Sequence, residues 1–151
     1  MFEKILICLD GSKAAEKTLA FISHEAVHFR SRLVLLRVVS LPEVLVPANI
    51  PGSPALPLRT QGAIKRTIEE QYEATRYLED IAGPLKDKGL KVEIVVLPGA
   101  AGETILNYAE ANGCTLIVIG AHGHGGFRRF ALGSTADYVV HRSTVPVLTT
   151  R

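Results

Sequence analysis

Five short, nearly continuous apolar runs constrain the fold of this chain more than any other feature of its sequence. They are rich in Ile, Val and Leu, and they cover Lys4–Leu9, Arg32–Val39, Lys91–Leu97, Thr115–Ile119 and Val145–Thr149. Strands that do not alternate between polar and apolar residues are typically buried on both faces, as in a parallel sheet. Segments with helical periodicity separate the runs, and this alternation predicts an α/β sheet built from right-handed crossovers.

Four intervening segments are predicted to be helices, because their apolar residues recur at helical spacing. The first covers Ala14–Phe29, and its stripe consists of Ala15, Leu19, Ile22, Ala26 and Phe29. The second is longer, with a stripe made of Ile64, Ile68, Tyr72, Leu78, Ile81 and Leu85. We expect Gly83-Pro84 to kink or shorten this helix near its end. The third and fourth helices are predicted over Ala101–Asn112 and Ser134–Arg142.

The segment Leu41–Gly62 breaks this rhythm. It holds five of the eight prolines and only two charged residues, Glu43 and Arg59. So long a connection in a small domain is either a surface insertion or a functional segment. Because it follows the carboxyl end of a predicted strand, the functional interpretation is a flap over the mouth of a ligand site.

Composition excludes several classes of protein. A length of 151 residues favours one domain, and a net charge of +2 is too small to indicate nucleic acid or an anionic membrane as a partner. No apolar run approaches the ~20 residues of a membrane span, and the first residues lack the layout of a signal peptide, so we expect a cytoplasmic protein. Cys8 and Cys114 lie in or beside apolar runs and are expected to be buried thiols, not a disulfide or a metal site.

A glycine pattern near the C-terminus indicates a phosphate-bearing ligand. Gly120-Ala-His-Gly123 follows a predicted strand, and Gly133-Ser134-Thr135 comes nine residues later, where a helix is predicted to begin. Glycines that bare backbone amides, followed by a helix N-terminus, favour anion binding. Ligands of open parallel sheets bind beyond the carboxyl ends of the strands, where the strand order reverses. If the first and fourth strands are neighbours, Asp10 faces the Gly120 loop.

Two roles remain open for Asp10, which follows the first strand. A carboxylate repels phosphate, so in a ligand site Asp10 should lie at the sugar or base and accept hydrogen bonds there. The alternative is that Asp10 caps the first helix, with Ser12 as the rival for that cap. The two roles are compatible.

The pattern Gly-x2-Gly-x9-Gly-Ser resembles the nucleotide-binding signature of the universal stress protein family. ILICLDGSKAAEKTLAF is similar to the opening strand, acidic residue and first helix of that family, and LVLLRVV is similar to its second strand. The resemblance spans nearly the whole chain and implies a single universal stress protein domain over residues 1–151. The implied fold is a Rossmann-like, five-stranded parallel sheet of order 3-2-1-4-5 with helices on both faces.

The resemblance also implies an ATP site and a dimer. By position, the nucleotide-binding residues would be Asp10 and the backbone of Val38 at the adenosine end, Gly120 and Gly123 along the ribose and phosphates, and Gly133, Ser134 and Thr135 at the phosphates. Any Mg²⁺ or Mn²⁺ would be held by the phosphates. The edge strand Val145–Thr149 would pair across a homodimer, with Pro146 lacking one donor. Cys8 and Arg37 depart from the family pattern, where proline and histidine are common, but neither removes a phosphate contact.

Signals for catalysis are sparse. The chain has no P-loop motif and no nucleophile elbow, and one carboxylate, Asp10, is weak support for hydrolysis. We therefore expect a nucleotide-binding sensor or regulator with protein effectors that the sequence does not name. A slow ATPase or phosphotransferase using the same site and a nucleotide-free dimeric scaffold are the alternatives.

Two pairs in the glycine-rich segment are open to a second interpretation. His122 and His124 lack further ligands at metal-binding spacing and are predicted to be exposed loop residues, not part of a zinc site. Arg128 and Arg129 are predicted to be solvated charges, and the alternative is that one of them reaches a terminal phosphate.

Overall fold

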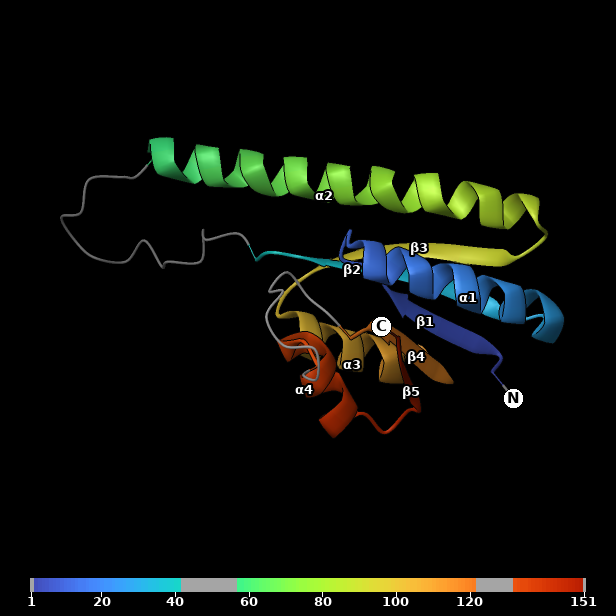
Figure 1. The fold of residues 1–151 in the computed structure, drawn as a ribbon. Helices are drawn as coiled ribbons and strands as arrows, with labels where there is room; N and C mark the ends of the chain where they lie inside the picture. Colours follow the sequence, from blue (N-terminus) through green and yellow to red (C-terminus); the bar gives the residue numbers. More distant parts are fainter. Residues whose placement is uncertain (1, 42–56, 122–131, 151) are drawn as a thin grey trace.

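The structure, a computed structural model, describes residues 2–41, 57–121 and 132–150, with the backbone alone described over 57–61. Within these ranges, parallel strands form one five-stranded sheet in the order β3-β2-β1-β4-β5 (Figure 1). The strands are β1 (Lys4–Cys8), β2 (Arg32–Val39), β3 (Lys91–Pro98), β4 (Leu116–Gly120) and β5 (Val147–Thr150). The predicted fold class and strand order are confirmed, and β1 and β4 are neighbours.

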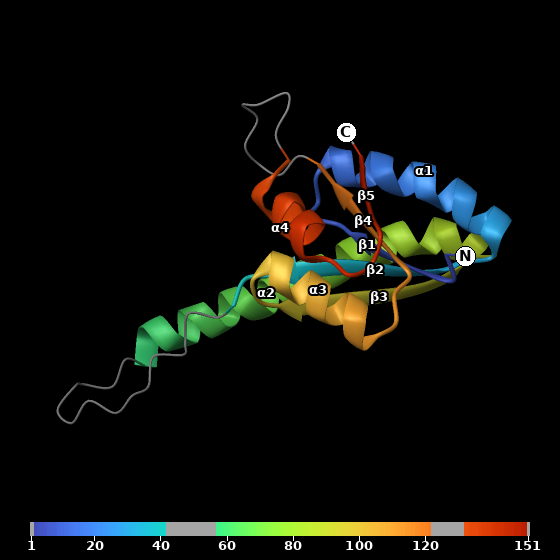
Figure 2. The same ribbon diagram turned by 90° about the horizontal axis from the view of Figure 1, so that it is seen from below.

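Helices cover both faces of the sheet. They are α1 (Lys13–Phe29), α2 (Pro57–Asp87), α3 (Ala101–Ala111) and α4 (Ser134–Arg142). α1 and α2 lie on one face, and α3 and α4 lie on the other (Figure 2). Each helix returns the chain from the carboxyl end of one strand to the start of the next, so all the strands end on the same side of the molecule (Figure 1).

The core is divided by the sheet into two layers. Successive strand residues point to opposite faces, so Ile5 and Ile7 of β1 pack toward α1 and α2, whereas Leu6 and Cys8 pack toward α3 and α4. The central pairing aligns Ile7 with Leu35 of β2 and with Val118 of β4, which are fully buried. Continuous apolar strands are therefore explained by burial on both sides.

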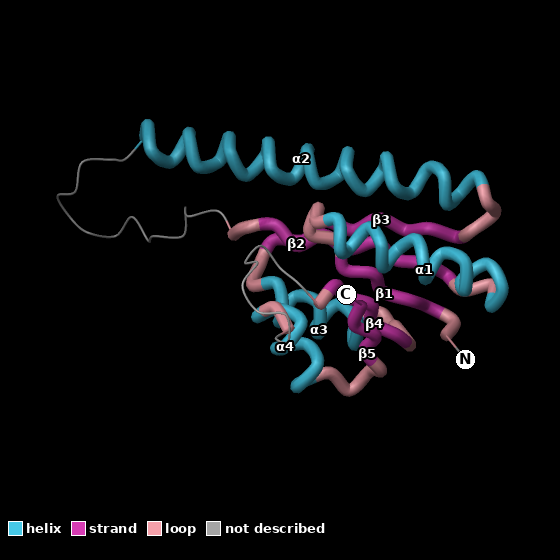
Figure 3. Tube along the Cα trace, viewed as in Figure 1, coloured by secondary structure: helices cyan, strands magenta, loops and turns pink. Residues whose placement is uncertain are grey.

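The long connection and the second helix differ from expectation. α2 begins at Pro57, so the prediction of a loop up to Gly62 is wrong for its last six residues; residues 42–56 lie outside the described part of the chain. Proline is favoured at the first position of a helix, where its missing N–H is not needed. α2 also continues past Pro84 to Asp87 as one helix (Figure 3), so the expected shortening is wrong. Burial of Leu78 and Leu85 on either side of Pro84 stabilises the helix there despite one lost hydrogen bond.

The predicted apolar stripes are buried over only part of their length. In α1 the stripe from Ala15 to Ala26 is buried, but Phe29 is exposed. In α2 the stripe is buried at Leu78 and Leu85, whereas Ile64, Ile68 and Tyr72 are exposed. None of the helices within the described ranges is both long enough and apolar enough to cross a membrane.

Candidate functional site

A pocket lies at the carboxyl ends of β1, β2 and β4, closed on one side by the first turns of α3 and α4. It holds about 640 Å³ of space, its open mouth included. The lining residues are Cys8, Leu9, Asp10, Ala15, Leu36, Val38, Ala101, Ile105, Ile119, Gly120, Gly133, Ser134, Thr135 and Ala136. The pocket therefore occupies the place where the strand order reverses, between β1 and β4.

Six of the seven residues assigned to a nucleotide line this pocket together. They are Asp10, Val38, Gly120, Gly133, Ser134 and Thr135. The seventh, Gly123, lies outside the described residues, as do His122, His124, Arg128 and Arg129. The structure thus brings the described members of the set to one cavity, while their role in binding stays a prediction.

The N-terminus of α4 opens onto the pocket without a side-chain cap. Gly133 occupies the cap position and forms no side-chain hydrogen bond there. The first intrahelical bond runs from the N–H of Asp137 to the carbonyl of Gly133, at 2.8 Å, so the N–H groups of Ser134, Thr135 and Ala136 lie outside the helical pattern. These donors, together with the helix dipole and two hydroxyl groups, favour an anion at this end of the pocket.

Backbone hydrogen bonds fix Gly133 at the end of the sheet. Its N–H donates to the carbonyl of Ala121 at 2.7 Å, and the N–H of Ala121 donates to the carbonyl of Thr150 at 2.8 Å. Ala121 directly follows β4, and Thr150 is the last residue of β5. The first turn of α4 is therefore positioned by the carboxyl ends of both strands.

The N-terminus of α1 is capped, in contrast to that of α4. The hydroxyl of Ser12 accepts a hydrogen bond from the N–H of Ala15 at 3.2 Å, so Ser12 and not Asp10 is the helix cap. The N–H of Ser12 donates to Oδ1 of Asp10 at 2.9 Å. This bond orients the exposed Asp10 carboxylate at the pocket and leaves its second oxygen for another donor.

Arg37 and Val38 lie on opposite faces of β2, because successive strand residues alternate. Val38 lines the pocket. Arg37 lies on the other face, with its guanidinium carbon 5.1 Å from the ring centre of Tyr77. The hydroxyl of Tyr77 donates to Oε1 of Glu16 at 3.4 Å, and burial, followed by the charge of Glu16, raises the pKa of Tyr77 to about 12. Arg37 therefore supports the pocket from behind and does not line it.

Cys8 presents a protonated thiol to the pocket. Burial is the main cause of its raised pKa, and the charges of Cys114 and Asp10 add to it. The pKa of Cys114 is also raised, again chiefly by burial. Both thiols are free and buried, as predicted. A thiol held in the protonated form is a poor nucleophile, so Cys8 contributes an apolar wall.

Sequence reasoning missed the contribution of α3. Ala101 and Ile105 line the pocket because α3 packs tightly against α4. The contact is made at Gly102, where a Cβ atom would lie 2.5 Å from Cδ1 of Tyr138. A glycine in the first turn of a helix was the available signal, since it permits close approach of another element.

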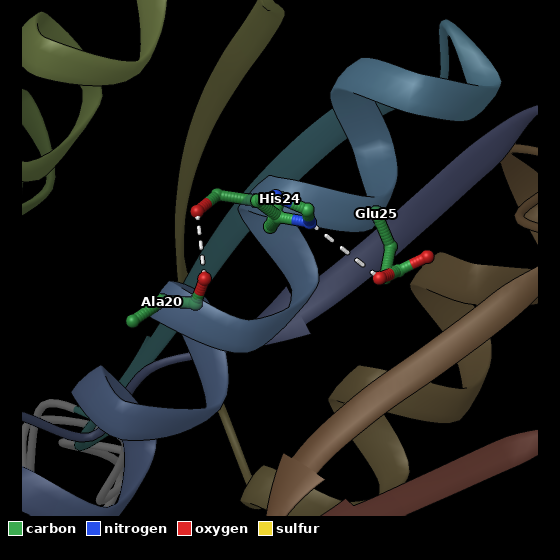
Figure 4. A network of polar contacts seen from close by, with 4 residues as sticks. Ala20, His24 and Glu25 are labelled. Atoms are coloured by element: carbon green, nitrogen blue, oxygen red, sulfur yellow. Dashed lines mark hydrogen bonds and ion pairs between the residues drawn. The ribbon is translucent and has the colours of Figure 1, made fainter.

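Residues that could hold a metal do not cluster in the described part of the chain. Across the ranges the structure describes, no group of three or more His, Cys, Asp or Glu side chains has metal-binding geometry. His24 lies on the surface of α1 with its Nδ1 3.6 Å from Oε1 of Glu25 (Figure 4). Nearby, the hydroxyl of Ser23 donates to the carbonyl of Ala20 at 3.0 Å. Ser23 is buried, whereas His24 is exposed and Glu25 is half-buried, and none of the three lines the pocket.

Comparison with known proteins agrees with the fold. The family model described as the universal stress protein family matches residues 1–151. Universal stress protein YxiE of Bacillus subtilis is 30% identical over 151 residues, covering all of both chains. MJ0577 of Methanocaldococcus jannaschii is 28% identical, covering 98% of this chain and 94% of the relative. Its solved structure superposes with a TM-score of 0.83 at 27% identity, covering 99% of this chain and 96% of MJ0577.

The fold alone is also shared with UspA of Lactobacillus plantarum. That structure superposes with a TM-score of 0.81 at 23% identity and covers 99% of this chain and 98% of its own. A family model that matches from the first to the last residue, together with a relative of the same length, establishes the assignment. The chain belongs to the universal stress protein family.

Proposed function

We propose that the pocket binds an adenine nucleotide, ATP in the first instance, and that the protein is a cytoplasmic nucleotide-binding regulator or sensor of the stress response. The observation that carries the proposal is the uncapped N-terminus of α4, which opens onto the same cavity as Asp10 and Gly120. Free amides and a helix dipole attract phosphate, and a carboxylate attracts hydroxyl donors. The pocket therefore combines groups suited to phosphates with a group suited to a sugar.

Each of the six predicted residues that line the pocket has a defined part in this proposal. Ser134 and Thr135 would offer amides and hydroxyls to the phosphates, with Gly133 and Gly120 allowing close backbone approach. Asp10, oriented by Ser12, would accept a hydrogen bond from a ribose hydroxyl. The backbone of Val38 would meet the base. ATP would bring any divalent cation with it, bound to its phosphates.

A related structure suggests which adenine nucleotides to include in the test. A universal stress protein solved in complex with cAMP shares this fold, with a TM-score of 0.60 at 16% identity and coverage of 99% of this chain. At that identity the likeness carries the fold alone. It supports testing cAMP beside ATP, ADP and AMP.

Binding without efficient catalysis is the expected activity. The thiol of Cys8 is held protonated, and no His, Lys or Arg that could serve as a base or cation beside Asp10 is among the described residues that line the pocket. A nucleotide held by helix amides and released unchanged fits a regulator better than a hydrolase. We further propose a homodimer formed through β5, which is an edge strand of the sheet.

The first experiment identifies the ligand directly. The protein is purified without added nucleotide, denatured, and any released small molecule is identified by mass spectrometry. Calorimetric titration with ATP, ADP, AMP and cAMP then ranks their affinities. An adenine nucleotide recovered at about one per chain supports the proposal. No released nucleotide and no binding at millimolar concentration would contradict it and favour a nucleotide-free scaffold.

Ser134→Glu provides the matched test of the phosphate end. Ser134 is exposed at the first position of α4, where a carboxylate stabilises the helix through its dipole. The variant should therefore fold normally, while its negative charge repels phosphate and weakens ATP binding by at least about tenfold, or ~1.4 kcal/mol. Ser134→Gln is the neutral control of the same size and should retain most of the affinity. Equal losses in the two variants would count against an anion site. Turnover of ATP with Mg²⁺, lost in Asp10→Ala, would instead indicate the slow ATPase.

A further inference from the structure

The N-terminal half of α2 packs few side chains against the rest of the domain. Among the described side chains of α2, those of residues 62–87, the buried ones begin at Ala74 and none from 62 to 73 is buried. This half of the helix extends beyond the end of the sheet (Figure 1). It is held to the end of β2 by Glu70, whose Oε1 accepts hydrogen bonds from the N–H and the hydroxyl of Ser40, both at 3.3 Å.

This half nevertheless carries three large apolar residues in one line. Ile64, Ile68 and Tyr72 are 45%, 61% and 63% exposed. Their i, i+4, i+8 spacing places them along one side of the helix, and we refer to them as the α2 stripe. An exposed stripe of this kind on a helix typically marks a surface that another helix covers.

Charges beside the α2 stripe make it complementary to itself. Lys65 and Glu69 lie on one flank of the stripe and form an ion pair of 3.8 Å within the helix. If two copies of α2 pair antiparallel about a two-fold axis at Ile68, the same flanks of the two helices face each other. Lys65 of one copy then lies within a turn of Glu69 of the second copy, and Ile64 lies opposite Tyr72.

We propose that the α2 stripe binds the α2 stripe of a second copy of this chain in an antiparallel helix pair centred on Ile68. The contact is separate from any pairing of β5, because α2 covers the other end of the sheet, beside β3 and β2. The stripe offers about 300 Å² per copy, given on the order of 150–250 Å² for a large side chain, against about 800 Å² in a standard interface. The association is therefore weak and depends on protein concentration.

Ile68→Cys tests the proposed axis directly. The native cysteines are buried, so the introduced thiol is the accessible one in the described part of the chain. Two copies paired about Ile68 bring these thiols together, and mild oxidation should convert most of the protein into a disulfide-linked dimer on a non-reducing gel. Glu73→Cys is the control, because Glu73 is also exposed but lies on the far side of the same helix. It should cross-link at least about tenfold more slowly.

Mass in solution provides the second measurement. Light scattering should show that the mean mass of the wild type rises as the protein concentration increases from about 10 to about 300 µM, the range of weak contacts. Ile68→Glu should abolish this rise. Lys65→Glu and Glu69→Lys should each reduce it, and the double reversal should restore it. Equal cross-linking at positions 68 and 73, or a rise unchanged by Ile68→Glu, would overturn the proposal. A thiol at position 68 that resists both cross-linking and a water-soluble maleimide would also overturn it, by showing that the stripe is covered within its own chain.

Discussion

The guanidinium of Arg37 lies directly behind Gly11, where a Cβ atom would be 3.5 Å from Nη1 of Arg37. Gly11 follows Asp10 and adopts a φ of +84°, so the turn that carries the carboxylate into the pocket has a left-handed residue at its centre. Arg37 also packs on the ring of Tyr77 from α2. The position of Asp10 thus depends on the left-handed conformation of Gly11 and on the guanidinium of Arg37, which stacks on Tyr77.

Gly11→Ala is expected to weaken ligand binding beyond its effect on stability. A left-handed φ costs a residue with a Cβ atom about 1–2 kcal/mol, while the contact with Arg37 at 3.5 Å is an ordinary one. Gly89→Ala is the matched control, because Gly89 has a φ of +83° and no neighbour within 4 Å of a Cβ atom. Urea unfolding should show similar losses for both variants. ATP titration should show weaker binding only for Gly11→Ala, and equal affinities would indicate that the turn does not position Asp10.

Gly102→Ala is expected to separate α3 from α4. A Cβ atom there would lie 2.5 Å from Cδ1 of Tyr138, which also stacks on Arg142 at 4.1 Å, so the helices must move. Overpacking of this kind costs about 1–3 kcal/mol, and the shift should also alter the pocket, because Ala101 and Ile105 line it. The free energy of unfolding and the ATP affinity are the measurements.

Gly83→Ala is the control for this substitution. Gly83 lies in α2 with no neighbour within 4 Å of a Cβ atom, so alanine should stabilise the helix by up to ~1 kcal/mol. Adding Tyr138→Ala to Gly102→Ala should recover part of the loss by removing Cγ and Cδ1, the two atoms nearest to the added Cβ. A double variant no more stable than Gly102→Ala would show that the cost arises elsewhere.

The fold followed from the sequence because its determinants are local and repeated. Runs such as Arg32–Val39 can satisfy both faces only inside a covered parallel sheet, and every predicted strand lies within two residues of the observed one at either end. The pocket depended on one further step: glycines and Asp10 placed immediately after strands meet only if β1 and β4 are neighbours, a strand order that the family resemblance implied.

The parts that sequence reasoning missed depend on tertiary contacts. The continuation of α2 through Pro84 overrides a local preference, because buried Leu78 and Leu85 fix the helix on both sides. The exposure of Ile68 is invisible to periodicity, which identifies an apolar side without showing what covers it. The part of α3 in the pocket required the contact of Gly102 with Tyr138, and these residues are far apart in the sequence.

Alkaline pH is expected to destabilise the protein through Cys8. The pKa of the buried thiol is raised, whereas an exposed thiol ionises at about pH 8.5, so the unfolded state loses its proton first. The contribution of the Cys8 thiol to the free energy of unfolding is complete below about pH 8. It declines as the pH rises above that value, by up to ~1.4 kcal/mol per pH unit for each such group. Cys114 adds to the slope, and above about pH 10 Tyr77 and Tyr108, each with a pKa raised to about 12, add more.

Urea unfolding between about pH 7 and about pH 10, below the range in which tyrosines ionise, measures how the free energy of unfolding changes with pH. Cys8→Ala should be less stable at neutral pH by about 1–2 kcal/mol, because it leaves a small cavity in the core. Its stability should nevertheless decline less steeply with pH than that of the wild type. Parallel curves for the two proteins would show that the thiol is not the group responsible.

Thr149→Pro is expected to break the proposed β5 dimer while preserving the sheet. The carbonyls of Pro146 and Thr150 accept hydrogen bonds from Ile117 and Ala121 on the β4 side, at 2.9 and 2.8 Å. Because backbone groups alternate along a strand, the N–H of Thr149 points away from β4 toward the open edge. Proline there removes a donor needed only by a pairing chain, a position where edge strands tolerate it.

Light scattering at low micromolar concentration, where the weaker α2 contact is not populated, distinguishes the outcomes. Wild type and Thr149→Val, which retains the N–H, should have the mass of a dimer, and Thr149→Pro should have that of one chain with an unchanged circular dichroism spectrum. A dimeric Thr149→Pro would place the interface elsewhere.

The same variant tests whether dimer formation and ligand binding are coupled. Thr150 positions Ala121 and hence Gly133, so both events involve the same end of the sheet. If they are coupled, Thr149→Pro should bind ATP more weakly than the wild type. Unchanged affinity in the monomeric variant would show that each chain binds nucleotide independently of the other.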